Sequence, residues 1–173
     1  NGYKVTSVPS GEDGRLHPEA VAANMGDDVA AVMVTNPNTL GIFETNMPEI
    51  TRLVHEGGGL VYCDGANLNA ILGHTTMGLM GVDVMHFNLH KTFSTPHGGG
   101  GPGAGPVAVR SFLEPYLPVP RILRDPDTGA FSRSSEAERS VRRVHGFFGN
   151  FLVFVRAYAY ILRHGPDGLR DVA

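Results

Sequence analysis

The chain has 173 residues, of which 42% are hydrophobic and 18% charged, with a formal net charge of −3. This composition suits one ordinary domain with a buried core. Fourteen basic against seventeen acidic side chains leave no positive surplus for binding nucleic acid or an anionic membrane. No apolar run approaches the roughly 18 residues that span a bilayer. The single cysteine, Cys63, excludes an internal disulfide, so we expect an intracellular protein.

The first predicted elements are a strand at 3–8, where apolar and polar residues alternate, and a helix at 17–24 with proline in its first turn. A continuous apolar run at 29–34 then predicts a strand buried on both faces. Turn-forming residues follow at 35–41.

A second helix is expected at 47–55, because Pro48 opens it and three glycines close it. Further strands are predicted at 60–63, 82–87 and 106–109. The last third differs, with an Arg/Ser/Glu segment at 132–143 and a helix at 148–164.

Strands that alternate with helices predict an α/β fold with a mostly parallel sheet flanked by helices. In such sheets ligands bind beyond the carboxyl ends of the strands. Segments 35–39, 64–67 and 88–92 should meet at that edge. We also expect an internal fragment of a longer polypeptide, since the sequence starts in a strand and stops in a helical segment.

Lysine is rare here, since only Lys4 and Lys91 occur against twelve arginines. Lys91 follows the strand expected at 82–87 and should lie in an apolar setting that disfavours a charged ammonium. A neutral amine can condense with an aldehyde. The simpler interpretation is a lysine whose stem packs while its head reaches water, and spacing alone favours it.

Asp64 follows the strand expected at 60–63. A carboxylate at this place can hold the ring N–H of pyridoxal phosphate (PLP) and keep the ring protonated as an electron sink. An aspartate that caps the next turn is the common alternative. Asp64 and Lys91 are 27 residues apart with one strand between them, which suits the two ends of one cofactor. Together they make PLP the leading hypothesis.

The segment 97–106 reads HGGGGPGAGP. An HGGG run can supply an oxyanion hole in esterases, but these also need a G-x-S-x-G elbow, which the sequence lacks. The G-x-G-x-x-G contained in the run does not lie between a strand and a helix. The remaining interpretation is a flexible or close-packed loop beside the site.

A cluster of possible metal ligands also occurs in the sequence: His86, His90, His97, Asp83 and Asp64. None of the familiar metal-binding spacings is present among them. We therefore expect no metal site, with the histidines in hydrogen-bonded or core positions. Cys63, inside an apolar strand, should be an unreactive buried thiol.

The segment 88–93, Asn-Leu-His-Lys-Thr-Phe, followed by Pro-His-Gly-Gly-Gly-Gly-Pro-Gly at 96–103, resembles the P-protein family of the glycine cleavage system. These proteins are PLP-dependent glycine decarboxylases. Segments 35–44, 64–70 and 155–160 match the family as well. The likeness covers nearly the whole chain and corresponds to the C-terminal half of the long P-protein, or to the second subunit of the split form.

The resemblance implies the large domain of a fold-type-I, aspartate-aminotransferase-like PLP enzyme, present here in part. Within this partial domain of residues 1–173, residues 1–110 would form the cofactor-binding α/β core. Residues 111–173 would form a loop and a long helix that lead toward a small C-terminal domain. Residues that hold the phosphate and stack on the ring would precede Asn1.

Lys91 would form the Schiff base with PLP, and Asp64 would pair with the ring nitrogen. The other residues that the resemblance places at the site are Ala66 against the ring face, His90 and Thr92 beside the cofactor, and Asn36, Asn38 and Thr39 near the cofactor or substrate.

The implied reaction is decarboxylation of glycine, with transfer of the aminomethyl group to the lipoyl arm of H-protein. The implied partners are glycine, lipoylated H-protein and the other half of P-protein in a homo- or hetero-oligomer, in the cytoplasm of a bacterium or the mitochondrion of a eukaryote. The fragment alone is expected to be inactive. Two alternatives stay open: another fold-type-I enzyme, such as an aminotransferase or lyase, and a non-catalytic fragment that only completes a dimer interface.

Overall fold

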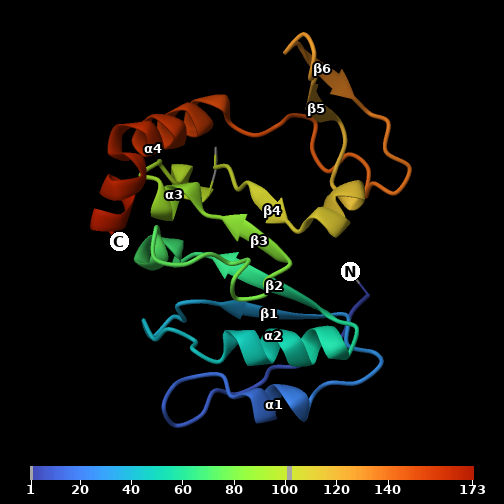
Figure 1. Ribbon diagram of the computed structural model, residues 1–173, viewed down its shortest axis with the longest axis vertical. Helices are drawn as coiled ribbons and strands as arrows, with labels where there is room; N and C mark the ends of the chain where they lie inside the picture. The colour runs from blue at the N-terminus through green and yellow to red at the C-terminus, as the bar shows by residue number, and fades with distance from the viewer. Residues whose placement is uncertain (1, 101–102) are drawn as a thin grey trace. The chain divides into compact units, whose positions relative to one another are not determined.

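The computed structural model describes residues 2–100 and 103–173, which fall into two compact units (Figure 1). The first unit contains residues 1–108 and 150–173, and the second contains residues 109–149. Within the described ranges, no helix is both long and apolar enough to cross a membrane.

The first unit is built on a sheet with the strand order β1-β2-β3-β4. The strands are β1 (Ala31–Thr35), β2 (Leu60–Gly65), β3 (Val84–Phe87) and β4 (Val107–Val109). β1, β2 and β3 are parallel neighbours. The expected α/β fold with a mostly parallel sheet is thereby confirmed, and the carboxyl ends of these three strands meet at one edge.

The helix α2 (Met47–Glu56) packs on β2 of this sheet, and α1 (Pro18–Ala22) packs on α2 (Figure 1). Both carry proline in their first turn, where the missing N–H costs no helical hydrogen bond. α2 ends at Glu56 and is capped by Gly57, and Gly58 follows with a φ of 79°, a conformation that favours glycine. Both predicted helices are confirmed, with ends shifted by a few residues.

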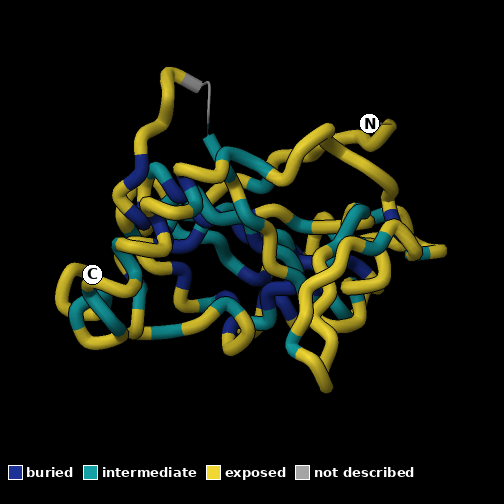
Figure 2. Tube along the Cα trace, turned by 90° about the horizontal axis from the view of Figure 1, so that it is seen from above, coloured by how far each residue is buried: buried dark blue, intermediate teal, exposed yellow. Residues whose placement is uncertain are grey.

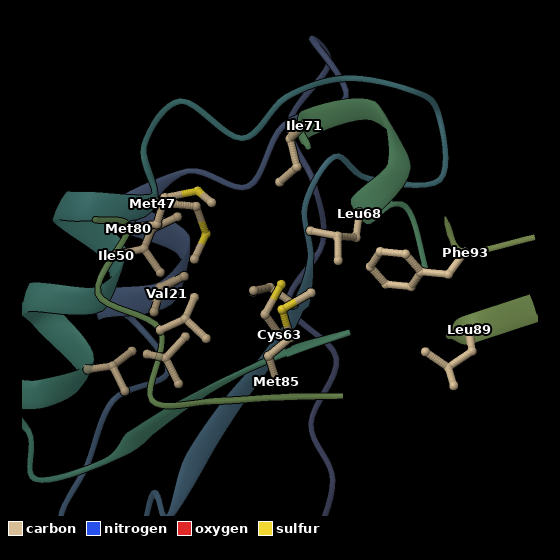
Figure 3. Packing of buried hydrophobic residues seen from close by; sticks show 14 of the residues in the cluster. Val21, Met47, Ile50, Cys63, Leu68, Ile71, Met80, Met85, Leu89 and Phe93 are labelled. Carbon is tan, nitrogen blue, oxygen red and sulfur yellow. The ribbon is translucent and has the colours of Figure 1, made fainter. Parts of the chain in front are cut away.

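Alternate residues of β2 point into the core, where Val61 and Cys63 are fully buried under α2. Figure 3 shows Met47 and Ile50 of α2 meeting Val21 and Met80 in this core, while Leu68 faces Phe93 farther along the sheet. Burial of each such side chain contributes about 1.5–3 kcal/mol to the free energy of folding. The prediction that Cys63 is buried is confirmed, and burial raises the pKa of its thiol.

Two predictions about the start of the chain are wrong. Residues 3–8 form no strand and are almost entirely exposed (Figure 2), because no neighbouring strand pairs with them. β1 is not buried on both faces either: Val34 is 8% exposed, whereas Met33 is 65% exposed. The helix α2 covers only one face of the sheet. The strands of the sheet therefore alternate between buried and accessible residues.

Short helical turns follow the strands β2 and β3: η1 (Leu68–Ile71), α3 (Leu89–Thr92) and η2 (Gly98–Gly100). The helix α4 (Phe151–Asp171) contacts α3. Gly165, with φ 63° and ψ −175°, divides α4 into two segments and precedes Pro166. The first segment therefore ends where the sequence predicted the helix to end.

The second unit contains η3 (Ser111–Tyr116) and the antiparallel pair β5 (Arg121–Arg124) and β6 (Phe131–Ser134). Oδ1 of Asp125 accepts backbone hydrogen bonds from Asp127 and Thr128 in the connecting turn, at 3.0 and 2.7 Å. The sequence predicted no strands here. α4 belongs to the first unit.

Candidate functional site

The site lies at the carboxyl edge of the three parallel strands. Thr35, Asp64 and His86 stand side by side in the register of β1, β2 and β3, so their side chains share one face of the sheet. Nδ2 of Asn67 donates to the carbonyl oxygens of Pro37 (2.9 Å) and Asn38 (3.2 Å), which ties the loop after β2 to the loop after β1. The predicted convergence of these strand ends is confirmed.

Asp64 is half-buried near the end of β2. Its Oδ1 accepts the backbone N–H of Ala66 at 2.8 Å and lies 3.2 Å from Nε2 of His86. Its Oδ2 has no hydrogen-bond partner among the residues that the structure describes. One oxygen is thus anchored by the protein while the other remains available. Ala66, small and half-buried, follows directly.

Lys91 belongs to α3, the turn that follows β3. It is exposed, so the apolar setting expected from the sequence is wrong. The helical spacing explains this, because Leu89 and Thr92 point inward and leave Lys91 on the outer side. Lys91 is therefore an accessible amine beside the carboxyl edge of the sheet.

Three buried side-chain oxygens close to Lys91 in the sequence lack hydrogen-bond partners among the described residues: Asn88 Oδ1, Thr92 Oγ1 and Thr95 Oγ1. Buried polar atoms in folded proteins are nearly always paired. Three such atoms within eight residues of sequence indicate a segment where a polar ligand or a further part of the protein completes the hydrogen bonding. Thr92, one of the expected cofactor neighbours, is 4% exposed.

His90 is half-buried and packs edge-on against His97, with ring centroids 4.5 Å apart. Burial lowers the pKa of His90, and the nearby His97 and Lys91 lower it further. A neutral imidazole can accept a proton or a hydrogen bond at the site. Of the glycine-rich segment, Gly98 and Gly99 have φ values of 65° and 63°, while 101–102 lie outside the described residues.

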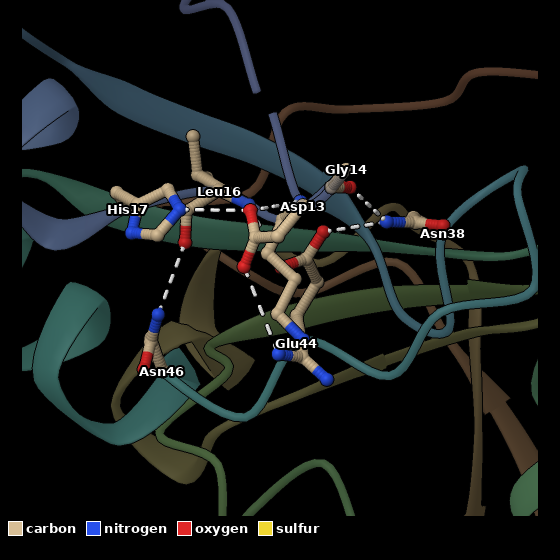
Figure 4. Close-up of polar contacts among 8 residues, drawn as sticks. Asp13, Gly14, Leu16, His17, Asn38, Glu44 and Asn46 are labelled. Atoms are coloured by element: carbon tan, nitrogen blue, oxygen red, sulfur yellow. Dashed lines mark hydrogen bonds and ion pairs between the residues drawn. The ribbon is translucent and has the colours of Figure 1, made fainter. Parts of the chain in front are cut away.

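Asn36 and Asn38 hold the loop after β1 together (Figure 4 shows the contacts of Asn38). Asn36 is 1% exposed, and its Oδ1 accepts the backbone N–H of Glu44 at 2.9 Å. Nδ2 of Asn38 donates to Oε1 of Glu44 and to the carbonyl oxygen of Gly14, both at 2.9 Å. These amides are engaged by the protein itself, which favours an indirect role for them. Thr39 is exposed in the same loop.

Sequence reasoning missed Tyr62 and the contact role of His86. The Tyr62 hydroxyl lies 2.7 Å from Nδ1 of His86, on the face that Asp64 shares. The alternation of side chains along β2 could have revealed Tyr62, because residues two apart in a strand, such as Tyr62 and Asp64, point to the same face. In the part of the chain that is described, no three His, Cys, Asp or Glu side chains are placed to hold a metal ion.

Known proteins resemble this chain over nearly its whole length. The chain is 52% identical over 172 residues to "Probable glycine dehydrogenase (decarboxylating) subunit 2" of Thermoplasma volcanium, and 53% identical over 170 residues to the protein of the same name from Treponema denticola. These alignments cover 99% and 98% of the chain but only 36% and 35% of the relatives. The chain thus spans about a third of the length of the curated relatives it matches.

Among solved structures, a glycine decarboxylase (P-protein) of the glycine cleavage system in inhibitor-bound form superposes with a TM-score of 0.74 at 27% identity. That match covers 98% of this chain and 39% of the P-protein chain. The cysteine desulfurase CsdA from Escherichia coli shares the fold alone, with a TM-score of 0.54 at 16% identity over 87% of this chain and 37% of that one. The family model for aminotransferase class-V matches residues 1–102, more than half of the sequence. By this match and by its fold, the chain belongs to the aminotransferase class-V family.

Proposed function

We propose that this chain forms the PLP-binding core of a P-protein-type glycine decarboxylase, which releases CO2 from glycine and passes the aminomethyl group to the lipoyl arm of H-protein. The families that it matches are PLP-dependent. The names of the relatives point to glycine as the substrate and to a second subunit as a partner.

One observation carries the proposal: a half-anchored carboxylate and an accessible lysine lie at the carboxyl edge of the same parallel sheet. The fit to PLP is chemical. Asp64 offers a free carboxylate oxygen for a ring N–H, and Lys91 offers a primary amine for an aldehyde. The unpaired oxygens of Asn88, Thr92 and Thr95 add a polar lining that a bound ligand would complete.

When bound, PLP would supply an electron sink for the electrons released as CO2 leaves. Lys91 would hold the cofactor through its primary amine. Asp64 would keep the ring nitrogen protonated, since a carboxylate favours the cationic partner. Ala66 would leave room for a flat ring, and neutral His90 would accept or hold a proton beside it. Asn36, Asn38 and Thr39 would shape the loop on the substrate side.

Reductive trapping tests the cofactor. The full-length protein is incubated with PLP and reduced with borohydride, and the modified peptide is mapped by mass spectrometry. Within this region only Lys4 and Lys91 can carry the label, so Lys4→Ala is the matched control for Lys91→Ala. We expect a pyridoxyl group on Lys91, lost in Lys91→Ala and kept in Lys4→Ala. An unlabelled Lys91 would contradict the proposal and favour a non-catalytic scaffold.

The substrate is tested by release of CO2 from carboxyl-labelled glycine in the presence of lipoylated H-protein and the second subunit. We expect release from glycine that depends on H-protein. The fold is shared with cysteine desulfurase, so amino-group transfer to a 2-oxo acid, or sulfur release from cysteine, would support the alternative fold-type-I enzymes instead.

A further inference from the structure

A chain of three polar side chains lies on the accessible face of the sheet. The Tyr62 hydroxyl is 2.7 Å from Nδ1 of His86, and Nε2 of His86 is 3.2 Å from Oδ1 of Asp64. The register explains the contact, because Asp64 of β2 stands opposite His86 of β3. Tyr62 lies two residues before Asp64 and therefore on the same face.

The contact between Tyr62 and His86 bears on which nitrogen of His86 carries the proton. If the Tyr62 hydroxyl donates to Nδ1, the ring of His86 carries its proton on Nε2, the nitrogen that lies 3.2 Å from Oδ1 of Asp64. In this tautomer Nδ1 accepts from Tyr62 and Nε2 faces Asp64. Burial and the nearby Asp64 raise the pKa of Tyr62, which keeps the phenol protonated and able to donate.

The two oxygens of Asp64 are consequently unequal. Oδ1 accepts the Ala66 N–H and lies 3.2 Å from Nε2 of His86, whereas Oδ2 has no partner within the described ranges. One hydrogen bond and one close imidazole nitrogen, both on the same oxygen, restrict the rotation of the carboxylate. We propose that His86, held by Tyr62, is a positioning residue that fixes Asp64 so that Oδ2 stays available to the ring nitrogen of PLP.

This inference rests on the proposed function, and the competing explanation is purely structural. His86 and Tyr62 are partly buried, and their rings lie 5.8 Å apart, so they could simply fill the sheet face. The two explanations predict different effects on binding. A positioning role affects only ligands that carry the ring nitrogen, whereas a structural role affects every ligand of the site.

The test measures the affinity of the full-length protein for PLP and for an analogue in which carbon replaces the ring nitrogen. His86→Leu removes the imidazole beside Asp64, His86→Gln retains an N–H at a comparable reach, and Tyr62→Phe removes only the hydroxyl. Tyr158→Phe is the matched control, because Tyr158 is 63% exposed on α4. Thermal unfolding followed by circular dichroism reports whether each variant is folded.

We expect His86→Leu to raise the Kd for PLP about tenfold, the order expected for loss of one polar contact to a charged group, with a smaller rise in Tyr62→Phe. The analogue should bind all variants alike, and His86→Gln should restore most of the affinity for PLP. Equal losses of affinity for PLP and the analogue, or no loss of affinity in His86→Leu, would overturn this inference but leave the proposed function standing. A wild-type protein that carries no label on Lys91 overturns the proposed function and this inference with it.

Discussion

His55 and Asp83 link α2 to the sheet at the edge opposite the candidate site. Nε2 of His55 lies 2.7 Å from Oδ2 of Asp83, and the same oxygen accepts the backbone N–H of Val61 at 2.8 Å. Asp83 is 2% exposed and directly precedes β3, while Val61 lies at the start of β2. One carboxylate therefore joins a helix and two strands.

Replacing His55 with alanine should destabilise the protein by about 1–3 kcal/mol, because a buried carboxylate loses one of its donors. Urea unfolding measures this change. His74→Ala is the control, since His74 is exposed. A His55 variant as stable as the control would show that the contact contributes nothing. PLP binding should survive in the folded fraction, because the contact lies at the far edge of the sheet.

Glu44→Gln tests the loop that follows β1. Glu44 is 4% exposed, and its two oxygens accept hydrogen bonds from the Leu16 backbone N–H and Asn38 Nδ2, both at 2.9 Å (Figure 4). Glutamine has the same shape but puts an NH2 group against one of these donors. We expect a loss of about 1–3 kcal/mol in the free energy of unfolding. Glu12→Gln, at an exposed glutamate, should leave it unchanged.

The pKa of His90 should lie below its ordinary value of 6.5. Burial is the main cause, so His97→Gln should raise this pKa only partly. Because the folded state then binds fewer protons than the unfolded state, stability is full above pH 6.5 and decreases as pH falls below it. NMR titration of labelled histidines, assigned with His90→Gln, measures the value. A His90 that titrates at or above 6.5 would contradict the prediction.

The ends of β2 and β3 were predictable because apolar runs mark buried strands, and parallel strands bring their carboxyl ends together. The error at 3–8 has a physical cause: alternation describes a strand only if another strand supplies its hydrogen bonds. Tyr62 and His86 are 24 positions apart in the sequence, and their contact depends on the register between their two strands. Local sequence patterns carry no information about this register.

The hairpin of β5 and β6 was missed for a different reason. Its strands read Arg-Ile-Leu-Arg and Phe-Ser-Arg-Ser, with few of the β-branched residues that identify strands. The turn at Asp125 had a clearer signal, since Asp-Pro-Asp-Thr-Gly is rich in turn formers. Short exposed strands with polar residues are thus less visible than the core strands that carry the site.

Gly65→Ala should separate β2 from β3 at the point where Asp64 meets His86. A Cβ on Gly65 would overlap the backbone carbonyl oxygen of His86 and crowd the side chain of Met85. Because backbone cannot yield as a flexible side chain does, we expect a loss of about 1–3 kcal/mol in stability. Gly146→Ala is the control, since a Cβ there meets open space.

The same substitution should weaken PLP binding beyond the loss in stability, because the carboxylate of Asp64 would lose its register with His86. Comparing Kd for PLP in the folded fractions of Gly65→Ala and His86→Leu separates the two effects. Similar losses, with no further loss in the double variant, would indicate that both act through the Asp64–His86 contact. Additive losses would show instead that Gly65 supports the cofactor by another route.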